Sequence, residues 1–226
     1  MRKIFLALLA LSMGALTANA DSLVTVRPLT GTDSVDWSQL GIPETQIPLS
    51  FSFITANSVT GTGSYASTSI LDVGEVVQQG LSVNPYRDFE GNFKLGDYLN
   101  YTNDSGPLTL TFTQGYTQIG AQIESNDFGQ FTAQICDSNN SCFTEVGYAD
   151  PSNNNSAIYI GIDSSSPITW VTFSLTSVGG NGRLNSFAIN EVTLDGPVVT
   201  SEPSSFLLLG TGLVGLASAL RRKFAR

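Results

Sequence analysis

The sequence has no histidine, two cysteines and few basic residues, and each shortage excludes a class of function. Without histidine there is no Ser-His-Asp or Cys-His catalytic pair, no histidine-ligated zinc and no imidazole pH switch. The 226 residues hold 10 lysines and arginines against 19 aspartates and glutamates, a formal charge of −9. Because nucleic-acid binding needs clustered basic residues that displace phosphate counterions, the sequence predicts no nucleic-acid partner.

Long apolar runs are also scarce, and the two that occur lie at the ends of the chain. Near the N-terminus, Arg2 and Lys3 precede an apolar run over residues 4–16, and small residues follow as far as Ala20. This order is typical of a secretory signal peptide. The run is too short for a membrane anchor, since about 20 apolar residues are needed to span a bilayer. We expect residues 1–20 to be a signal peptide that is cleaved between Ala20 and Asp21.

The C-terminal run has three parts. Ser201, Glu202 and Pro203 lead into a glycine-rich apolar segment over residues 206–220, and a basic cluster ends the chain at Arg226. The positive-inside rule keeps such a cluster in the cytoplasm while the apolar segment enters the bilayer as a helix. The rest of the chain would then lie on the far side of the membrane, where the signal peptide also directs it.

This tail resembles the PEP-CTERM sorting signal of Gram-negative bacteria. The run over residues 202–212 is close to the family pattern, although Ser201 stands where the family has the first proline of its motif. The resemblance implies an exosortase as partner, a membrane protease thought to cleave near the tripeptide and pass the protein to the cell surface. It also implies a membrane contact through the C-terminal helix before processing, and extracellular polysaccharide as a further partner. A plain C-terminal anchor is the alternative.

Residues 21–198 are expected to form one exported domain between the signal peptide and a sorting tail at 199–226. Residues 21–200 keep four basic residues against 18 acidic ones, a formal charge of −14. The electrostatic field of so negative a domain attracts cations, and jelly rolls commonly hold a structural calcium ion through loop carboxylates. No Asp-x-Asp-x-Asp-Gly loop is present. The sequence therefore predicts no metal ligand and no cofactor, and leaves a structural calcium ion open against solvated surface acids.

The exported domain shows the period-two alternation of antiparallel strands. Apolar residues recur at every second position over 108–113, 131–135, 158–163 and 171–176, with polar residues between them. Runs rich in Gly, Pro, Asn and Ser separate these stretches. This pattern predicts an all-β fold, a two-sheet antiparallel β-sandwich of jelly-roll type. Residues 23–100 are less regular and are expected to supply two or three strands and long loops.

Two details refine this prediction. Residues 164–167 are expected to form a turn between two strands. After Ile189 the apolar alternation changes phase across Asn190 and Glu191, and a β-bulge there would keep both halves facing the core. The blocks between residues 91 and 190 also resemble a β-sandwich domain often found ahead of this sorting tail, a resemblance that implies no biochemical activity.

The two cysteines are close in sequence. Cys136 and Cys142 flank a polar turn between two strand-like runs, so a hairpin would bring them together. In an exported protein this arrangement predicts a structural disulfide. The alternative, a reactive thiol pair, lacks a basic neighbour that would lower a thiol pKa.

Few residues qualify for binding or catalysis. Trp170 lies out of phase with Val171 and Trp37 lies in a polar stretch, so both are candidate platforms for sugar stacking, with a loop-covered Trp170 as the alternative. Glycosidases use two carboxylates about 5–10 Å apart, and Asp88 and Glu90 would share one face of a strand, but such pairs arise by chance among 18 acids. We name no catalytic residue.

These observations predict a protein that is exported across the inner membrane and reaches the cell surface or the extracellular space. We expect an exosortase-sorted surface or extracellular-matrix protein with a structural or adhesive role and no enzymatic activity. A carbohydrate-binding jelly-roll module, with or without calcium dependence, is the alternative.

Overall fold

The computed structural model describes residues 21–26, 31–67, 73–80, 89, 93–150, 156–180 and 182–197. They lie almost wholly in one compact unit that ends at Gly196, and a second unit begins at Pro197. Within these residues the regular elements are thirteen strands and one short 3-10 helix, η1 (Trp37–Leu40). Among the described residues there is no α-helix, so the predicted all-β antiparallel fold class is confirmed. The strands are β1 (Ser22–Val24), β2 (Asp33–Val35), β3 (Gln46–Ile47), β4 (Ser50–Ile54), β5 (Thr60–Tyr65), β6 (Gly74–Gln78), β7 (Tyr98–Tyr101), β8 (Leu108–Ser125), β9 (Gly129–Asp137), β10 (Cys142–Ala149), β11 (Ile158–Val178), β12 (Phe187–Ile189) and β13 (Val192–Pro197).

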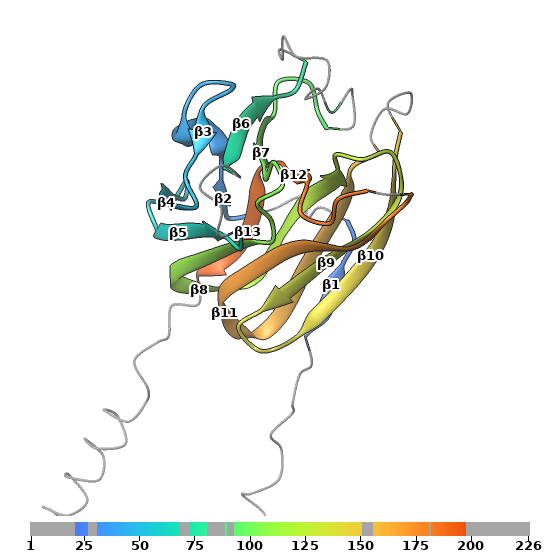
Figure 1. Ribbon diagram of the computed structural model, residues 1–226. Coiled ribbons are helices and arrows are strands. Elements are labelled where there is room, and N and C mark those ends of the chain that lie inside the picture. Colours follow the sequence, from blue (N-terminus) through green and yellow to red (C-terminus); the bar gives the residue numbers. More distant parts are fainter. Residues whose placement is uncertain are drawn as a thin grey trace, which may run out of the picture. The chain divides into compact units, whose positions relative to one another are not determined.

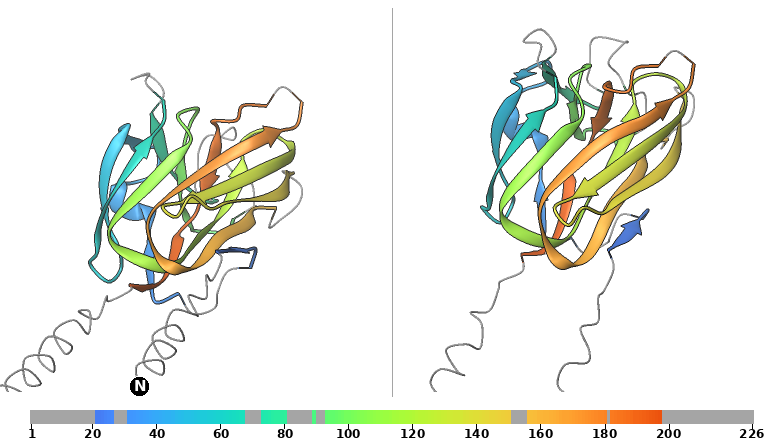
Figure 2. Two further views of the ribbon diagram at one scale, coloured as in Figure 1. Left: turned by 90° about the horizontal axis from the view of Figure 1, so that it is seen from below. Right: turned by 60° about the horizontal axis from the view of Figure 1, so that its bottom comes forward.

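The strands form two layers that share the long strands β8 and β11 (Figure 1). In the first layer, β4, β5, β8, β11, β9 and β10 follow one another across the sheet. In the second layer, the other halves of β8 and β11 continue through β12, β7 and β6 to β3, and β1 pairs with β11. Figure 2 shows β8 and β11 curving from one layer into the other. The layers therefore belong to one continuous, folded sheet.

The curvature of β8 and β11 has a local cause. Their pairing shifts register between Asp163 and Ile168 and again between Ile168 and Trp170. At this corner Pro167 packs against Gly115 so closely that a Cβ on residue 115 would lie 2.5 Å from the Pro167 Cβ. The turn predicted for residues 164–167 is therefore wrong: these residues stay within β11, at the place where the strand crosses between layers.

The larger apolar core lies between the layers. The predicted inward residues of β8, β9 and β11 are buried, among them Leu110, Phe131 and Phe173, except Ile158, which is partly buried. A second, smaller cluster packs Phe89 and Phe93 with residues of β6, β7 and β12. The second layer is therefore buried on both sides around these strands.

One expectation about strands is corrected and one stays open. Between Ser22 and Tyr101 the structure has seven strands instead of two or three, because short pairs here are stabilised by contacts with distant strands. The phase change at Asn190 and Glu191 lies between β12 and β13, which both pair with β8. The Asn190 N–H donates to the carbonyl oxygen of Gln122 on β8 between them, so the chain stays beside β8 across the phase change and the β-bulge stays a prediction. Phe187 and Leu194, on either side of it, are both buried, as the alternation predicted.

Candidate functional site

The outer surface of the first layer has an unusually uniform chemistry. Strands β4 and β5 alternate between exposed and buried residues, and every exposed residue on them except Ile54 carries a hydroxyl group. The same holds for the outward positions of β8 next to β5. Together with outward residues of β11, these side chains form a surface that we call the hydroxyl face. Its members are Ser50, Ser52, Thr60, Thr62, Ser64, Thr109, Thr111, Thr113, Thr172 and Trp170.

Strand register arranges these side chains in rows. One row consists of four consecutive Cα partners on β4, β5, β8 and β11, namely Ser52, Thr62, Thr111 and Trp170. Directly opposed side chains on one face of a sheet have Cβ atoms about 4.5–5.5 Å apart. Rows along a strand repeat every second residue, about 6.6–6.8 Å. The hydroxyl face is thus a grid of small polar groups fixed by the backbone.

Hydrogen bonds between neighbouring strands order part of this grid. The Oγ1 atoms of Thr109 and Thr172 are 2.8 Å apart, and those of Thr60 and Thr113 are 3.3 Å apart. The Thr113 hydroxyl also lies within 2.9 Å of the Thr60 carbonyl oxygen, to which it can donate. Each hydroxyl still has lone pairs left for a ligand.

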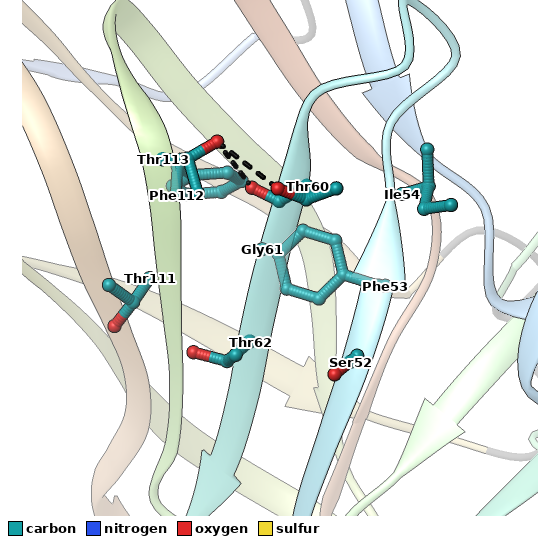
Figure 3. A pocket seen from close by; sticks show the side chains of 9 residues that line it. All are labelled: Ser52, Phe53, Ile54, Thr60, Gly61, Thr62, Thr111, Phe112 and Thr113. Carbon is teal, nitrogen blue, oxygen red and sulfur yellow. Dashed lines mark hydrogen bonds between the residues drawn. The ribbon is translucent and has the colours of Figure 1, made fainter.

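The face contains a hollow of about 410 Å³ over β4, β5 and β8. Figure 3 shows the nine residues that line it. Six of them, including Ser52, Thr62 and Thr111, are outward members of the strands, whereas Phe53 and Phe112 are buried. Gly61 is the Cα partner of both Phe53 and Phe112 and faces the core, where the Phe53 ring occupies the space that a Cβ would need. Trp170 is the Cα partner of Thr111, so its indole belongs to β11, the strand beside the hollow.

The two tryptophans predicted as stacking platforms differ in environment. Trp170 is partly exposed and lies on the hydroxyl face, which satisfies the first requirement of a platform. Trp37 is completely buried, and its Nε1 donates a hydrogen bond of 2.7 Å to the carbonyl oxygen of Asn190. The expectation for Trp37 is therefore wrong: its polar neighbours Ser38 and Gln39 are exposed on η1 while the indole points into the core.

The hydroxyl face carries no charged side chain, in contrast to the rest of the exported domain. Charged pairs lie elsewhere, for example where Arg183 contacts Asp104 and Asp127 at loops. A carboxylate is instead buried in the core: Asp33 accepts a 2.7 Å hydrogen bond from the Tyr116 hydroxyl. Burial, with this bond and the Asp33 charge, raises the pKa of Tyr116 above its usual range.

Cys136 and Cys142 are joined by a disulfide, so this prediction is confirmed. They are partners in the register of the β9–β10 hairpin, as expected from their spacing. Cys136 is also the Cα partner of Thr172 on β11. The disulfide therefore continues a row of the hydroxyl face to the edge strand β10.

Beside this hairpin, two carboxyl groups share one site. Asp21 accepts hydrogen bonds from the hydroxyls of Ser141, at 2.6 Å, and Ser164. Burial opposes ionisation of Asp21, but these hydrogen bonds hold its pKa below the usual value. Burial and the neighbouring Asp21 charge raise the pKa of Asp137, although the backbone N–H groups of Ser141 and Asn139 also bond its carboxylate. No local sequence pattern indicates this pairing, because the two aspartates are far apart in the chain.

Metal and catalytic candidates gain no support from the described part of the chain. It contains no group of three or more His, Cys, Asp or Glu side chains placed to hold a metal ion. Two loop carboxylates have hydrogen-bond partners within the protein: Asp36 caps η1 and Asp195 accepts a hydrogen bond from Thr32. Asp88 and Glu90 lie outside the described residues. A structural calcium ion therefore stays open, as it was from the sequence.

The predicted sorting elements also lie outside the described residues. These are Ala20 on one side of the cleavage site, and Ser201, Glu202 and Pro203 in the tail. Within the described ranges, none of the helical structure is long and apolar enough to cross a membrane.

Comparison with known proteins identifies the tail. The family of the PEP-CTERM protein-sorting motif matches residues 199–223, which include the Ser-Glu-Pro tripeptide and the apolar segment. No curated protein and no solved structure matches the chain. The chain therefore ends in a PEP-CTERM sorting motif, and this motif implies an exported protein that is sorted by an exosortase.

Proposed function

We propose that this protein is a non-catalytic component of the cell surface or extracellular matrix, with a structural or adhesive role. The sorting motif at residues 199–223 carries this proposal, because such a signal directs its cargo to the surface. The cargo fits an adhesive role, because its exposed first layer presents a broad uncharged grid of hydroxyls.

The sorting step is tested at the C-terminus of the mature protein. Mass spectrometry of the protein from hosts with and without exosortase should show a shortened C-terminus only where the enzyme is present. An intact Arg226 in both hosts would contradict the proposal.

The departure from the family motif provides a matched pair of variants. Ser201→Pro restores the family tripeptide and should be processed at least as completely as the natural chain. Pro203→Ala removes a residue that matches the motif and should leave most of the protein unprocessed in the membrane fraction. Equal processing of both variants would show that the tripeptide is not the recognition element.

A carbohydrate-binding module is the second candidate. The position of Trp170, on the exposed face and in the same row as Thr111, favours it over a hydrolase. Binding that requires added calcium would support the calcium-dependent form, whereas turnover of glycosides that is lost in Asp88→Asn or Glu90→Gln would support an enzyme.

A further inference from the structure

We infer that the hydroxyl face is the adhesive surface and that it binds a neutral, hydroxyl-rich polysaccharide chain laid across β4, β5, β8 and β11. This inference rests on the proposed adhesive role and names its surface and its ligand class. The observation that carries it is the row Ser52, Thr62, Thr111 and Trp170, in which an indole continues a line of hydroxyls beside an open hollow.

The chemistry of the row matches a sugar polymer. Each hydroxyl can donate one hydrogen bond, can accept others and can rotate to suit its partner, so a grid of hydroxyls complements a ligand whose own polar groups are hydroxyls. The indole supplies a flat apolar surface with a polar edge, suited to the C–H face of a pyranose ring. Four strands span about 14 Å, more than one sugar ring, so a chain fits better than a monosaccharide.

Other ligand classes fit less well. Nucleic acid would need lysines and arginines, and the face has none. Protein interfaces are enriched in aromatic residues, methionine and arginine and are depleted in serine, whereas this face has one aromatic residue among serines and threonines. An anionic polymer would be repelled by a domain with a formal charge near −14. A neutral polyhydroxylated chain needs no basic residues, does not depend on many aromatic side chains and is not repelled by the negative charge.

The face is also accessible. Around β6, β7 and β12 the outer side of the second layer is covered by Phe89 and Phe93. The outward residues of β4 and β5 on the first layer are exposed. The concave part of this surface, over Gly61, is shown in Figure 3.

The test uses the exported protein purified from the surface of its host. Co-sedimentation measures binding to cellulose, starch, mannan and the neutral fraction of the host's extracellular polysaccharide, with alginate as the anionic polymer. Trp170→Ala removes the platform and Thr111→Glu places a charge in the row. Gln46→Glu adds the same charge at an exposed position on β3 in the second layer and is the matched control.

We expect binding to at least one neutral polymer and none to alginate. Trp170→Ala and Thr111→Glu should each weaken that binding about tenfold or more, as truncation of an interface anchor does, while Gln46→Glu should not change it. Near-ultraviolet circular dichroism establishes that each variant is folded. Absence of binding to every neutral polymer, or equal binding by all variants, would overturn the inference.

Further outcomes separate this inference from the proposed function. If the variants lose polymer binding and are shed from the surface into the medium, both are supported. If the natural protein stays at the surface without binding any neutral polymer, the inference fails and the proposed function stands. A natural protein that never reaches the surface would refute the proposed function.

Self-association is a separate outcome. If the natural protein is a dimer that Thr111→Glu dissociates, and it binds no polymer, the face is a self-association surface and the inference is overturned.

Discussion

The indole Nε1 of Trp37 donates a hydrogen bond of 2.7 Å to the carbonyl oxygen of Asn190, a residue 153 positions away. Asn190 lies in the break between β12 and β13, and its own side chain bonds the backbone and the side chain of Gln122 on β8. One buried contact thus ties η1 near the N-terminus to the last two strands of the domain. Trp37 is a structural anchor.

Replacing this anchor should destabilise the protein. Trp37→Phe removes the donor, leaves the Asn190 carbonyl buried without it and opens a small cavity, so the free energy of unfolding should fall by about 2–4 kcal/mol. The matched substitution Trp170→Phe, on the partly exposed face, should cost under about 1 kcal/mol. Urea unfolding monitored by circular dichroism measures both. An equal loss of unfolding free energy in the two variants would contradict the prediction that the buried tryptophan contributes more.

Glycines in β5 should be sensitive to a single methyl group. A Cβ on residue 61 would lie 2.3 Å from the Phe53 ring and 2.8 Å from the Thr111 carbonyl oxygen. Gly61→Ala should therefore lower the free energy of unfolding by about 1–3 kcal/mol. At Gly31 a Cβ would meet its nearest neighbour at 3.5 Å, so Gly31→Ala should be close to neutral. A neutral Gly61→Ala in thermal unfolding would show that the ring can move away.

The disulfide should contribute modestly to stability. Cys136 and Cys142 are six positions apart, so the closed loop is short and the entropic effect is about 2 kcal/mol. Replacing both cysteines by alanine should lower the free energy of unfolding by about that amount without loss of the fold. Thiol labelling of the natural protein should find both residues blocked until a reductant is added. Free thiols in the exported protein would contradict the pairing.

The carboxyl pair at the β9–β10 turn should titrate as a unit. The pKa of Asp21 is lowered in the folded state, so its stabilising effect is present above the unfolded value near 3.8 and is lost as the pH falls through the folded value. For Asp137 the dependence of stability on pH has the opposite sign. Burial raises its pKa, so its contribution to stability is greatest at low pH and declines as the pH rises through the folded pKa. Asp21→Asn should therefore destabilise the protein at pH 7, and Asp137→Asn should not.

The coupling within this pair has its own measurement. Because the Asp21 charge helps to raise the pKa of Asp137, Asp21→Asn should lower that pKa, as followed by carboxyl carbon chemical shifts in NMR. Asp163→Asn is a suitable control, since Asp163 is exposed and pairs with Ser22 through the backbone. An unchanged Asp137 titration in Asp21→Asn would mean that the two groups do not interact.

Local patterns predicted the central strands because burial there follows a simple alternation. Leu108 and Leu110 are buried and Thr111 is exposed, as the period-two rule requires. The same rule predicted the hairpin that joins the two cysteines. It failed for β5, where glycines face the core and the side chains of Phe51 and Phe53 on β4 fill the space above them.

The candidate site was visible in the sequence only as separate strands. Alternating serines and threonines indicate that one side of each strand is polar, but they do not say which strands are neighbours. The row from Ser52 to Trp170 depends on pairings between residues far apart in the chain. For Trp37 the local signal was misleading, because a short 3-10 helix can expose polar residues while it buries the indole between them.

The pairing of β1 with β11 also has a consequence for the order in which the strands can fold. Ser22 pairs with Asp163, and Asp21 is held by Ser141 and Ser164, so the first segment of the domain has its partners near the far end. A chain exported with its N-terminus leading would deliver β1 early and β11 late. The strand that emerges first must therefore wait, with its edge open, until nearly the whole domain has crossed. We expect docking of β1 to be among the last events of folding, and the exposed edge to need shielding from aggregation until then.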